Sequence, residues 1–466
     1  MLVMKFGGTS VGDAQCIAHV AGLIAEAREK DPKLVVVVSA MAKVTNALFA
    51  AARAAASGSG QEARQQIGQL LVRHQETARA LLRTPQELAA VERTLAAYLG
   101  EVDRFCQSIA VLGEVTVRTL DLVVGVGERL SSALVAAALR ERGLPAEAVS
   151  ATELIVTDAH FGAAQPLLDA TRPRVRERLL PMLERGIVPV VTGYIAATAD
   201  GVPTTLGRGG SDFSAAILGA CLDADAVWIW SDVDGILTAD PNIVPEARTL
   251  SVLSYADAAT LAAFGAEVLH PKTIAPLVER GIPLRLLNTF RPTHPGTWIV
   301  RQPQTDGPRP PAIISTRGLS LIGVVGDSEH WTPEVASRAL SALARAGVDV
   351  LMFTQSFSER TLTLLVRDAE KEASLQALRR EYQEDLERGY LRQVAVLSQV
   401  GTISVVGAPG GDGIAVVPKT FAALGRLGTQ IVSVTQSAAE YHVSVVVPED
   451  QVDASVCFIH RELNAE

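Results

Sequence analysis

The sequence predicts an α/β protein whose mostly parallel sheet lies between two layers of helices. Over roughly the first 300 residues, short β-branched runs alternate with Ala-rich helical stretches. The runs are continuously apolar rather than alternating, which is typical of parallel strands that are buried on both faces. A repeat near the end of the chain predicts, in addition, two copies of a smaller α/β module.

Four runs are expected to be strands, and two segments that follow such runs are expected to be helices. Residues 61–113 differ, because they are strongly helical, polar on one face and without strand signals. We expect them to form a helical insertion that covers part of the sheet. The expected strands are 34–39, 120–126, 187–193 and 226–231, and the expected helices are 128–143 and 212–222.

The repeat follows a polar, Pro-rich stretch at 301–311, which is a candidate linker. Residues 342–366 read ALARAGVDVLMFTQSFSERTLTLLV, and residues 423–447 read ALGRLGTQIVSVTQSAAEYHVSVVV. Both copies predict a helix, a glycine turn, a strand, a Thr-Gln-Ser turn and a second strand. The residues alone leave two roles open, namely contacts in a dimer or a pocket for a small ligand.

Composition narrows the class of protein. Hydrophobic residues make up 48% of the 466 residues, yet we find no apolar run as long as the ~20 residues of a membrane span. The first strand begins almost at Met1, which leaves no room for a targeting peptide. Cys16, Cys106, Cys221 and Cys457 lack CxxC spacing, which argues against disulfides and a metal site, and the net charge of −9 disfavours nucleic-acid binding. We expect a cytoplasmic protein with no membrane or nucleic-acid partner.

Two glycine clusters point to the chemistry. The strand-like start VMKF runs into GGTS at 7–10, and residues 206–212 read LGRGGSD. Paired glycines let backbone N–H groups approach an anion closely, and Lys5 adds a positive charge of the kind that neutralises phosphate oxygens. Neither cluster is a Walker loop. One cluster alone is as consistent with a plain strand-to-helix turn, but the two together favour a phosphoryl-transfer site.

Motifs in the same order along nearly the whole chain resemble those of aspartate kinases. The matching motifs are KFGGTSV at 5–11, VVVSA and VTNAL within 36–48, GERLSS at 127–132, TLGRGGSD at 205–212, WSDVDGI at 230–236 and FGAEVLHPKT at 264–273. The resemblance implies an amino-acid-kinase catalytic domain, a three-layer α/β/α sandwich, followed by two βαββαβ-type ACT regulatory domains. It implies a catalytic domain at 1–300 with the insertion at about 61–113, a linker at 301–312, and ACT domains at 313–395 and 396–466.

The implied reaction is MgATP-dependent phosphorylation of the side-chain carboxylate of L-aspartate to 4-phospho-L-aspartate. This reaction is the first step toward lysine, threonine and methionine. The metal would be Mg²⁺ carried with ATP, with no metal site of the protein's own. Because the chain ends within the second repeat, we expect a monofunctional enzyme without homoserine dehydrogenase. The alternatives are a kinase for a related amino-acid carboxylate and a catalytically weak, ACT-containing regulatory paralogue.

The resemblance also assigns the catalytic residues. Lys5 would hold the β- and γ-phosphate oxygens, and Asp212 would orient Lys5 and keep it charged. Gly7, Gly8 and Thr9 would donate hydrogen bonds to the same oxygens.

The substrate pocket for aspartate needs charges of both signs. Arg208 would clamp the α-carboxylate with two parallel hydrogen bonds, and Glu128 would bind the α-ammonium. Taken alone, Glu128 is as well explained as a carboxylate at a helix N-terminus, and Arg208 as a surface ion pair. The remaining substrate-binding residues are Ser39, Thr45, Gly209, Gly210 and Ser211.

The nucleotide side matches the family less well. Ser231 and Asp232 would line the adenine pocket. Leu237 replaces a common Tyr, Asn242 replaces a common Arg, and Glu267 replaces a frequent Lys, all on the ATP side. Lys272 would partly compensate for the reversed charge at Glu267. We expect these changes to affect the affinity for ATP more than the type of reaction that is catalysed.

Gln355 and Gln436 match glutamines that contact the effector in threonine-sensitive relatives. The resemblance is closer to the threonine-responsive branch, which implies feedback inhibition by threonine, with lysine as an alternative or additional effector. The implied assembly is a homodimer or higher homo-oligomer through the ACT domains. The plainer interpretation of both glutamines is a turn amide that caps a strand end.

Overall fold

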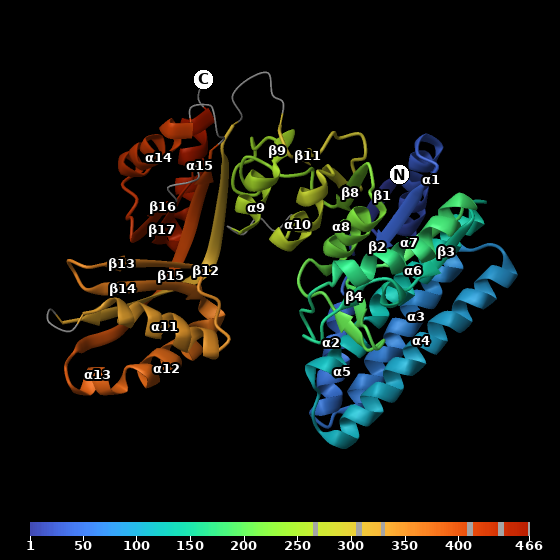
Figure 1. The fold of residues 1–466 in the computed structure, drawn as a ribbon, viewed down its shortest axis with the longest axis horizontal. Coiled ribbons are helices and arrows are strands. Elements are labelled where there is room, and N and C mark those ends of the chain that lie inside the picture. Colours follow the sequence, from blue (N-terminus) through green and yellow to red (C-terminus); the bar gives the residue numbers. More distant parts are fainter. Residues whose placement is uncertain (264–268, 304–309, 328–330, 408–412, 437–441, 465–466) are drawn as a thin grey trace. The chain divides into compact units, whose positions relative to one another are not determined.

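The computed structural model describes residues 1–466 except 264–268, 304–309, 328–330, 408–412, 437–441 and 465–466 (Figure 1). The chain forms two compact units. The first contains Met1–Ile236, Ser251–Ala262 and the described part of 267–304. The second contains Leu237–Leu250, Ala263 and the described residues from 310 on.

The first unit is built on an eight-stranded sheet in the order β3-β5-β2-β1-β8-β10-β11-β9. All neighbouring strands run parallel except β10 and β11, which confirms the expected mostly parallel sheet. The bounds are β1 Leu2–Phe6, β2 Leu34–Val38, β3 Ala146–Val149, β5 Val188–Thr192, β8 Ala226–Ser231, β9 Val252–Ser254, β10 Leu284–Asn288 and β11 Thr297–Val300. A small sheet is formed by β4 (Val156–Thr157), β6 (Ile195–Thr198) and β7 (Pro203–Thr205).

Helices cover both faces of the large sheet. Successive side chains of a strand point to opposite faces, so each strand contributes apolar side chains to the helices on both sides. Leu2, Met4 and Phe6 of β1 pack in one core with residues of α1 and α6, whereas Lys5 points to the face where α8 contacts β1, β2 and β8. The bounds of these helices and their neighbours are α1 Ala14–Lys30, α2 Val44–Ala56, α6 Val126–Glu141, α7 Leu168–Glu184, α8 Gly210–Leu222, α9 Tyr255–Ala263 and α10 Pro271–Arg280. The helices expected at 128–143 and 212–222 are therefore confirmed.

One expected strand is wrong. Residues 120–126 lie in helix α5 (Val117–Val124) and at the start of α6, and Thr116 caps α5 by accepting a hydrogen bond from the amide of Thr119 at 3.2 Å. Among the described residues, the helical stretch Val117–Glu141 is long and apolar enough to span a membrane by length and composition alone, but 89% of its most apolar 18 residues are buried inside the fold. Residues 120–126 span the junction of the two helices, where a short, mostly apolar run looks like a buried strand.

The helical insertion consists of α3 (Gly60–Leu81) and α4 (Pro85–Leu112), which lie side by side (Figure 1). Their main contacts are with α1, α2 and α6 rather than with strands. The helical prediction is confirmed, but the insertion covers a layer of helices and not the sheet itself.

The second unit contains a six-stranded sheet in the order β13-β14-β12-β15-β17-β16, with all neighbouring strands antiparallel. Two long strands, β12 (Ala312–Gly326) and β15 (Leu391–Val406), pair along its middle. The other bounds are β13 Met352–Ser356, β14 Thr361–Arg367, β16 Ser433–Gln436, β17 His442–Pro448, α11 Pro333–Arg345, α12 Lys371–Glu381, α13 Gln383–Glu387, α14 Gly413–Leu427 and α15 Val452–Asn464. The helix-strand-strand order repeats as expected.

Two details differ from the sequence prediction. Gln355 and Gln436 lie in strands β13 and β16 and not in turns. Residue 437, the serine of the second predicted Thr-Gln-Ser turn, lies outside the described residues. Ile313 packs in the core of the second module together with Val405 and Val443, although the predicted boundaries assign it to the first. The segment Leu237–Leu250 joins the same core, and the amide of Ile313 donates to the carbonyl of Thr238 at 2.8 Å.

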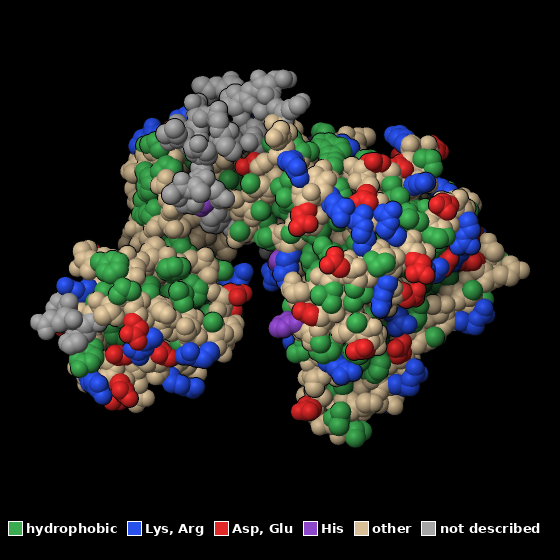
Figure 2. Space-filling model, in the orientation of Figure 1, with side chains coloured by type: hydrophobic (Ala, Val, Ile, Leu, Met, Phe, Trp, Pro, Cys, Tyr) green, Lys and Arg blue, Asp and Glu red, His purple; other side chains and the backbone are tan. Residues whose placement is uncertain are grey.

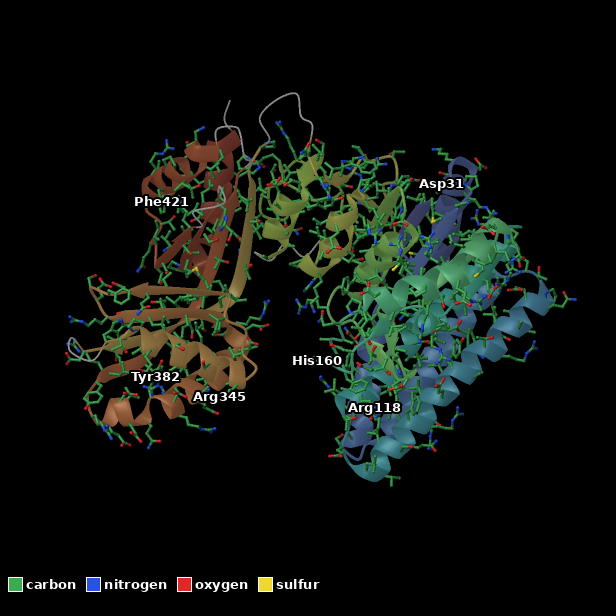
Figure 3. All side chains as sticks on the ribbon, in the orientation of Figure 1. Asp31, Arg118, His160, Arg345, Tyr382 and Phe421 are labelled. Atoms are coloured by element: carbon green, nitrogen blue, oxygen red, sulfur yellow. The ribbon has the colours of Figure 1, made fainter. Side chains whose placement is uncertain are left out.

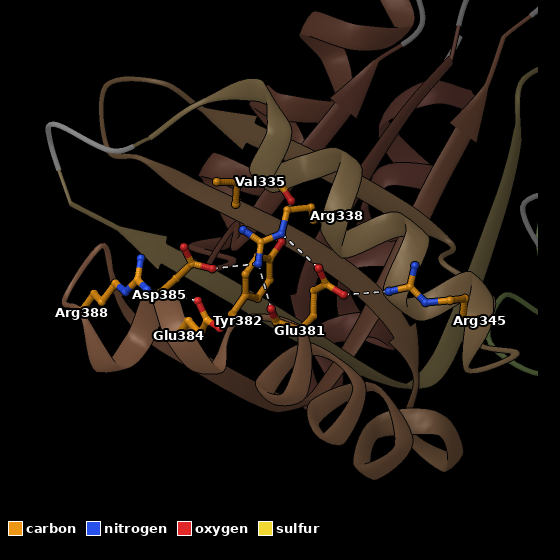
Figure 4. Close-up of polar contacts among 8 residues, drawn as sticks. All are labelled: Val335, Arg338, Arg345, Glu381, Tyr382, Glu384, Asp385 and Arg388. Atoms are coloured by element: carbon orange, nitrogen blue, oxygen red, sulfur yellow. Dashed lines mark hydrogen bonds and ion pairs between the residues drawn. The ribbon is translucent and has the colours of Figure 1, made fainter.

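A buried tyrosine anchors the first module of this unit (Figure 4). Tyr382 is fully buried, and its hydroxyl donates to the carbonyl of Val335 at 2.5 Å. The guanidinium of Arg338 lies 5.0 Å from the centre of its ring and pairs with Glu381 at 3.0 Å and with Asp385 at 2.8 Å. These contacts hold α11 against α12 and α13 in one orientation.

Candidate active site

The candidate site lies at the carboxyl ends of strands β1 and β2, the edge where open α/β sheets bind ligands. The turn that begins at Gly7 follows β1, and the loop that begins at Ser39 follows β2. The amide of Gly7 donates to Trp230 of β8 at 3.0 Å, and the amide of Ser39 donates to Phe6 at 3.1 Å. The two loops are therefore fixed directly to the ends of the central strands.

An ion pair joins the two sequence clusters. The ammonium of Lys5 lies 2.5 Å from Oδ1 of Asp212, and the two side chains are only 9% and 15% exposed. Asp212 lies in the first turn of α8, where the helix dipole favours a negative charge. Burying two charges is costly, so such a pair is weak evidence for stability, and a charged group held at the edge of a pocket is better explained by function.

Glycines at the site are required by close contacts. A Cβ on Gly8 would lie 2.9 Å from the carbonyl oxygen of Ala40, and a Cβ on Gly210 would lie 2.7 Å from the ring of Tyr194. Gly209 has φ +69°, and a Cβ there would lie 2.6 Å from Cβ of His270. Side chains at these positions would push apart the loops that form the pocket.

Glu128 is a buried carboxylate that is only partly satisfied. It lies in the first turn of α6 and is 3% exposed. Its Oε1 accepts from the amide of Ala40 at 3.2 Å, whereas Oε2 has no hydrogen-bond partner among the described residues. Burial raises the pKa of Glu128 to about 8, although the Ala40 amide and the charge of Lys5 oppose the shift. A buried carboxylate oxygen without a partner is suited to receive a cationic group of a ligand.

These groups line one cavity of about 770 Å³. Arg208 is exposed and lines the same cavity as Glu128 and Lys5. The cavity brings together ten residues that the sequence predicted, which are Lys5, Gly8, Ser39, Thr45, Glu128, Arg208, Gly209, Gly210, Ser211 and Asp212. The cavity thus carries both charge signs, as a small zwitterionic ligand requires.

Most of the residues predicted for the nucleotide do not line this cavity. Gly7 and Thr9 lie in the turn after β1, Ser231 ends β8, and Asp232 follows it as an exposed residue. The others are placed as follows: Lys272 in the first turn of α10, half-buried; Leu237 and exposed Asn242 in the second unit; and Glu267 outside the described residues.

Sequence analysis missed Asp121, Gly162 and Tyr194. Asp121 is buried on α5 and accepts from the amide of Gly162 at 2.8 Å, the amide of Thr205 at 3.1 Å and the hydroxyl of Thr205 at 2.7 Å. Burial raises the pKa of Asp121, and these hydrogen bonds oppose the shift. Gly162 and Tyr194 line the cavity, so Asp121 ties a cavity loop to β7.

The loop that contains Gly162 also packs against α5. Arg118 of α5 and His160 of the loop are labelled in Figure 3, and the Arg118 guanidinium lies 5.6 Å from the centre of the Phe161 ring. The only sequence signal for Asp121 was a charged residue inside an apolar run, and that run was interpreted as a strand.

In the part of the chain that the structure describes, no group of three or more His, Cys, Asp or Glu residues is arranged to hold a metal ion. The predicted effector residues lie at the two edges of the six-stranded sheet. Gln355 is half-buried, and its Nε2 has no hydrogen-bond partner among the described residues, whereas Gln436 is exposed.

Comparison with protein families defines the class of protein. Residues 1–288 match the amino acid kinase family, and residues 322–382 and 403–463 each match the ACT domain. The first match covers the cavity described above and every strand of the large sheet except β11, and the other two lie in the second unit.

Comparison with individual proteins shows which members of the amino acid kinase family the chain resembles. The chain is 33% identical to bifunctional aspartokinase/homoserine dehydrogenase 2, chloroplastic, of Arabidopsis thaliana, over 97% of this chain and 50% of that protein. It is 32% identical to aspartokinase 3, chloroplastic, of the same plant, over 98% of this chain and 80% of that protein. The crystal structure of E. coli aspartokinase III in complex with aspartate and ADP matches with a TM-score of 0.82 and 27% identity, over 99% of each chain.

The chain therefore belongs to the amino acid kinase family and, within it, to the aspartokinases. It spans about half the length of the bifunctional relatives that it matches. The resemblance inferred from the motifs is confirmed, whereas its closeness to the threonine-responsive branch stays a prediction.

The buried Glu128 predicts a dependence of stability on pH. Because its pKa rises from the usual 4.5 to about 8 on folding, the folded protein keeps a proton that the unfolded chain releases. This contribution is fully present below about pH 4.5 and is lost as the pH rises toward 8. We expect Glu128→Gln to flatten this part of the stability curve in urea unfolding between pH 5 and 8. The exposed Glu76→Gln is the control, and a Glu128→Gln curve parallel to the wild type would contradict the assignment.

Proposed function

We propose that the protein is an aspartate kinase that transfers the γ-phosphoryl group of MgATP to the side-chain carboxylate of L-aspartate. The observation that carries the proposal is the cavity in which Lys5, Glu128, Arg208 and Asp212 meet. The similarity to E. coli aspartokinase III, which was solved with aspartate and ADP, supports the choice of both substrates.

The proposed step needs positioning and charge neutralisation rather than a strong base. A side-chain carboxylate with an ordinary pKa of ~3.9 is already ionised near neutral pH, so its oxygen attacks the γ-phosphorus directly. The bond from the γ-phosphorus to the bridging oxygen breaks, ADP leaves, and the product is an acyl phosphate. Lys5, which Asp212 holds at the cavity wall, neutralises charge on the transferring oxygens. Mg²⁺ arrives with ATP as part of the substrate.

We propose that two side chains bind the α-carboxylate and the α-ammonium of the acceptor. Arg208 binds the α-carboxylate through paired N–H groups, and the unpartnered oxygen of Glu128 accepts from the α-ammonium. Ser39 and Thr45 add neutral hydrogen bonds from the loop after β2 and from α2. Gly209, Gly210 and Ser211 present the start of α8, whose N–H groups favour anionic groups.

On the nucleotide side, we propose that Gly7, Gly8 and Thr9 contact the phosphates and that Ser231 and Asp232 line the adenine site. Their position after β1 and β8 supports the assignment, since both strands end at the same edge of the sheet. We also propose Leu237, Asn242 and Lys272 as ATP contacts, on the resemblance of their motifs to those of aspartate kinases.

We further propose a cytoplasmic enzyme that catalyses the first step toward lysine, threonine and methionine. The proposed partners are small molecules and further copies of the chain, which would associate through the ACT domains into a homodimer or higher oligomer. Lys and Arg side chains are interspersed with Asp and Glu over the visible face of the first unit, without one basic stripe of the kind that binds nucleic acid (Figure 2).

ADP release tests the reaction. We expect turnover with MgATP and L-aspartate, and none above the no-acceptor rate with N-acetyl-L-glutamate, whose blocked amine has no charge for Glu128 to bind. Lys5→Ala should lower kcat by roughly 10³-fold, because a donor to the transition-state charge is lost. The exposed Lys30→Ala is the control.

Turnover with N-acetyl-L-glutamate instead of L-aspartate would favour a kinase for a related carboxylate. No turnover at any ATP concentration would favour a regulatory paralogue.

We propose feedback inhibition by threonine, lysine or both at the ACT domains. The Thr-Gln pairs in β13 and β16 support threonine, and the structure of E. coli aspartokinase III in complex with lysine and aspartate, with a TM-score of 0.80, supports lysine. An effector acts by binding one state of the enzyme more tightly than another.

Titration of the aspartate kinetics identifies the effector. We expect millimolar threonine to inhibit, and Gln355→Ala with Gln436→Ala to relieve the inhibition while the uninhibited rate is kept. Inhibition by lysine alone, with no effect of threonine, would contradict the threonine assignment.

A further inference from the structure

The helical insertion reaches the active site through one side chain. Arg73 lies in the middle of α3 and is half-buried. Its Nη1 donates to the carbonyl of Ala42 at 2.9 Å, and its Nη2 donates to the carbonyl of Gly12 at 2.9 Å. The two carbonyls belong to different loops, one after β2 and one after β1, so a single guanidinium bridges them.

Both loops form the cavity. Ala42 lines it together with its neighbours Met41 and Lys43, and Gly8 lines it from the turn after β1. The amide of Ala42 also donates to the carbonyl of Gly8 at 3.0 Å. In the proposed reaction, the turn after β1 binds phosphate and the loop after β2 binds the acceptor. The distance between these loops therefore sets the distance between the two reacting groups.

The backbone at the bridge is strained. Lys43, directly after the carbonyl that Arg73 binds, has φ +68° and ψ −2°, the left-handed conformation that side chains other than glycine rarely adopt. Holding a non-glycine residue there costs of order 1 kcal/mol, and such conformations persist only where the surroundings determine them. The bond to Arg73 fixes the orientation of the peptide unit that joins Ala42 to Lys43.

We propose that Arg73 is a positioning residue for phosphoryl transfer, which fixes the phosphate-binding turn relative to the acceptor-binding loop and holds Lys43 in its strained conformation. The inference rests on the proposed function, because it uses the roles assigned to the two loops. Lysine cannot replace Arg73, since one ammonium does not offer two N–H groups spaced to reach both carbonyls.

The matched control lies two turns further along the same helix. Arg79 is 58% exposed and pairs with Glu92 of α4 at 2.8 Å, away from the cavity-lining residues. We expect Arg73→Ala and Arg73→Lys to lower kcat by about 10- to 100-fold relative to Arg79→Ala, with each KM changed less than about threefold, because misplaced reactants lose rate rather than affinity. The concentration of binding-competent sites, titrated by calorimetry with aspartate, should stay unchanged.

Combining Arg73→Ala with Lys43→Gly tests the contribution of backbone strain at residue 43. Because glycine adopts the left-handed conformation without cost, Arg73→Ala should lower kcat less in the Lys43→Gly background than in the wild type. Equal losses in both backgrounds would contradict the strain argument. The positioning role would be overturned if Arg73→Ala had the same kcat as Arg79→Ala. It would also be overturned if the fall in kcat matched a fall in the concentration of binding-competent sites.

Hydrogen exchange separates this inference from the proposed reaction. Arg73→Ala should speed amide exchange in peptides that cover residues 7–13 and 39–46, and should leave peptides of α4 unchanged, whatever the substrate is. If the wild type lacks aspartate-dependent turnover, the proposed function fails, and the exchange result alone then decides whether Arg73 bridges the loops. Unchanged exchange in both loops would refute the bridge.

Discussion

The ion pair between Lys5 and Asp212 ties the central strand β1 to the first turn of α8, and the rest of the site is arranged around it. Strand β1 lies between β2 and β8 in parallel register, so Lys5 is fixed at the edge where three strands end. Removing either charge of such a buried pair would destabilise the fold, because the other charge would remain buried without a partner. The same pairing holds the Lys5 ammonium at the cavity that Asp212 also lines.

Around this ion pair, the loops that form the cavity approach one another closely at glycines, where no side chain intervenes. Gly8, Gly209 and Gly210 each lie where a Cβ would collide with a neighbouring loop or side chain. Glu128 lines the same cavity from the first turn of α6, and burial raises its pKa to about 8. Arg73 and Asp121 do not line the cavity but hold its loops, Arg73 through two backbone carbonyls and Asp121 through two amides and the Thr205 hydroxyl.

Much of this was predictable from sequence, for local reasons. The strands at 34–39, 187–193 and 226–231 were found because buried parallel strands are short and continuously apolar. The glycine clusters lie at the cavity, and the resemblance to aspartate kinases added Ser39, Thr45 and Glu128 to make ten cavity residues. The error at 120–126 arose because these residues span the end of α5 and the start of α6, where a short, mostly apolar and largely buried run looks like a strand. Asp121 and Arg73 were missed because their partners lie 31 to 84 residues away in the sequence, which no local pattern encodes.

The central claim is that the γ-phosphoryl group reaches the side-chain carboxylate of aspartate. Hydroxylamine tests it directly, because it converts an acyl phosphate to a hydroxamate. With MgATP, L-aspartate and hydroxylamine, we predict one aspartate β-hydroxamate formed for each ADP released, and none when Lys5→Ala replaces the wild type. Release of ADP with inorganic phosphate and without hydroxamate would mean that water is the acceptor, and would contradict the account.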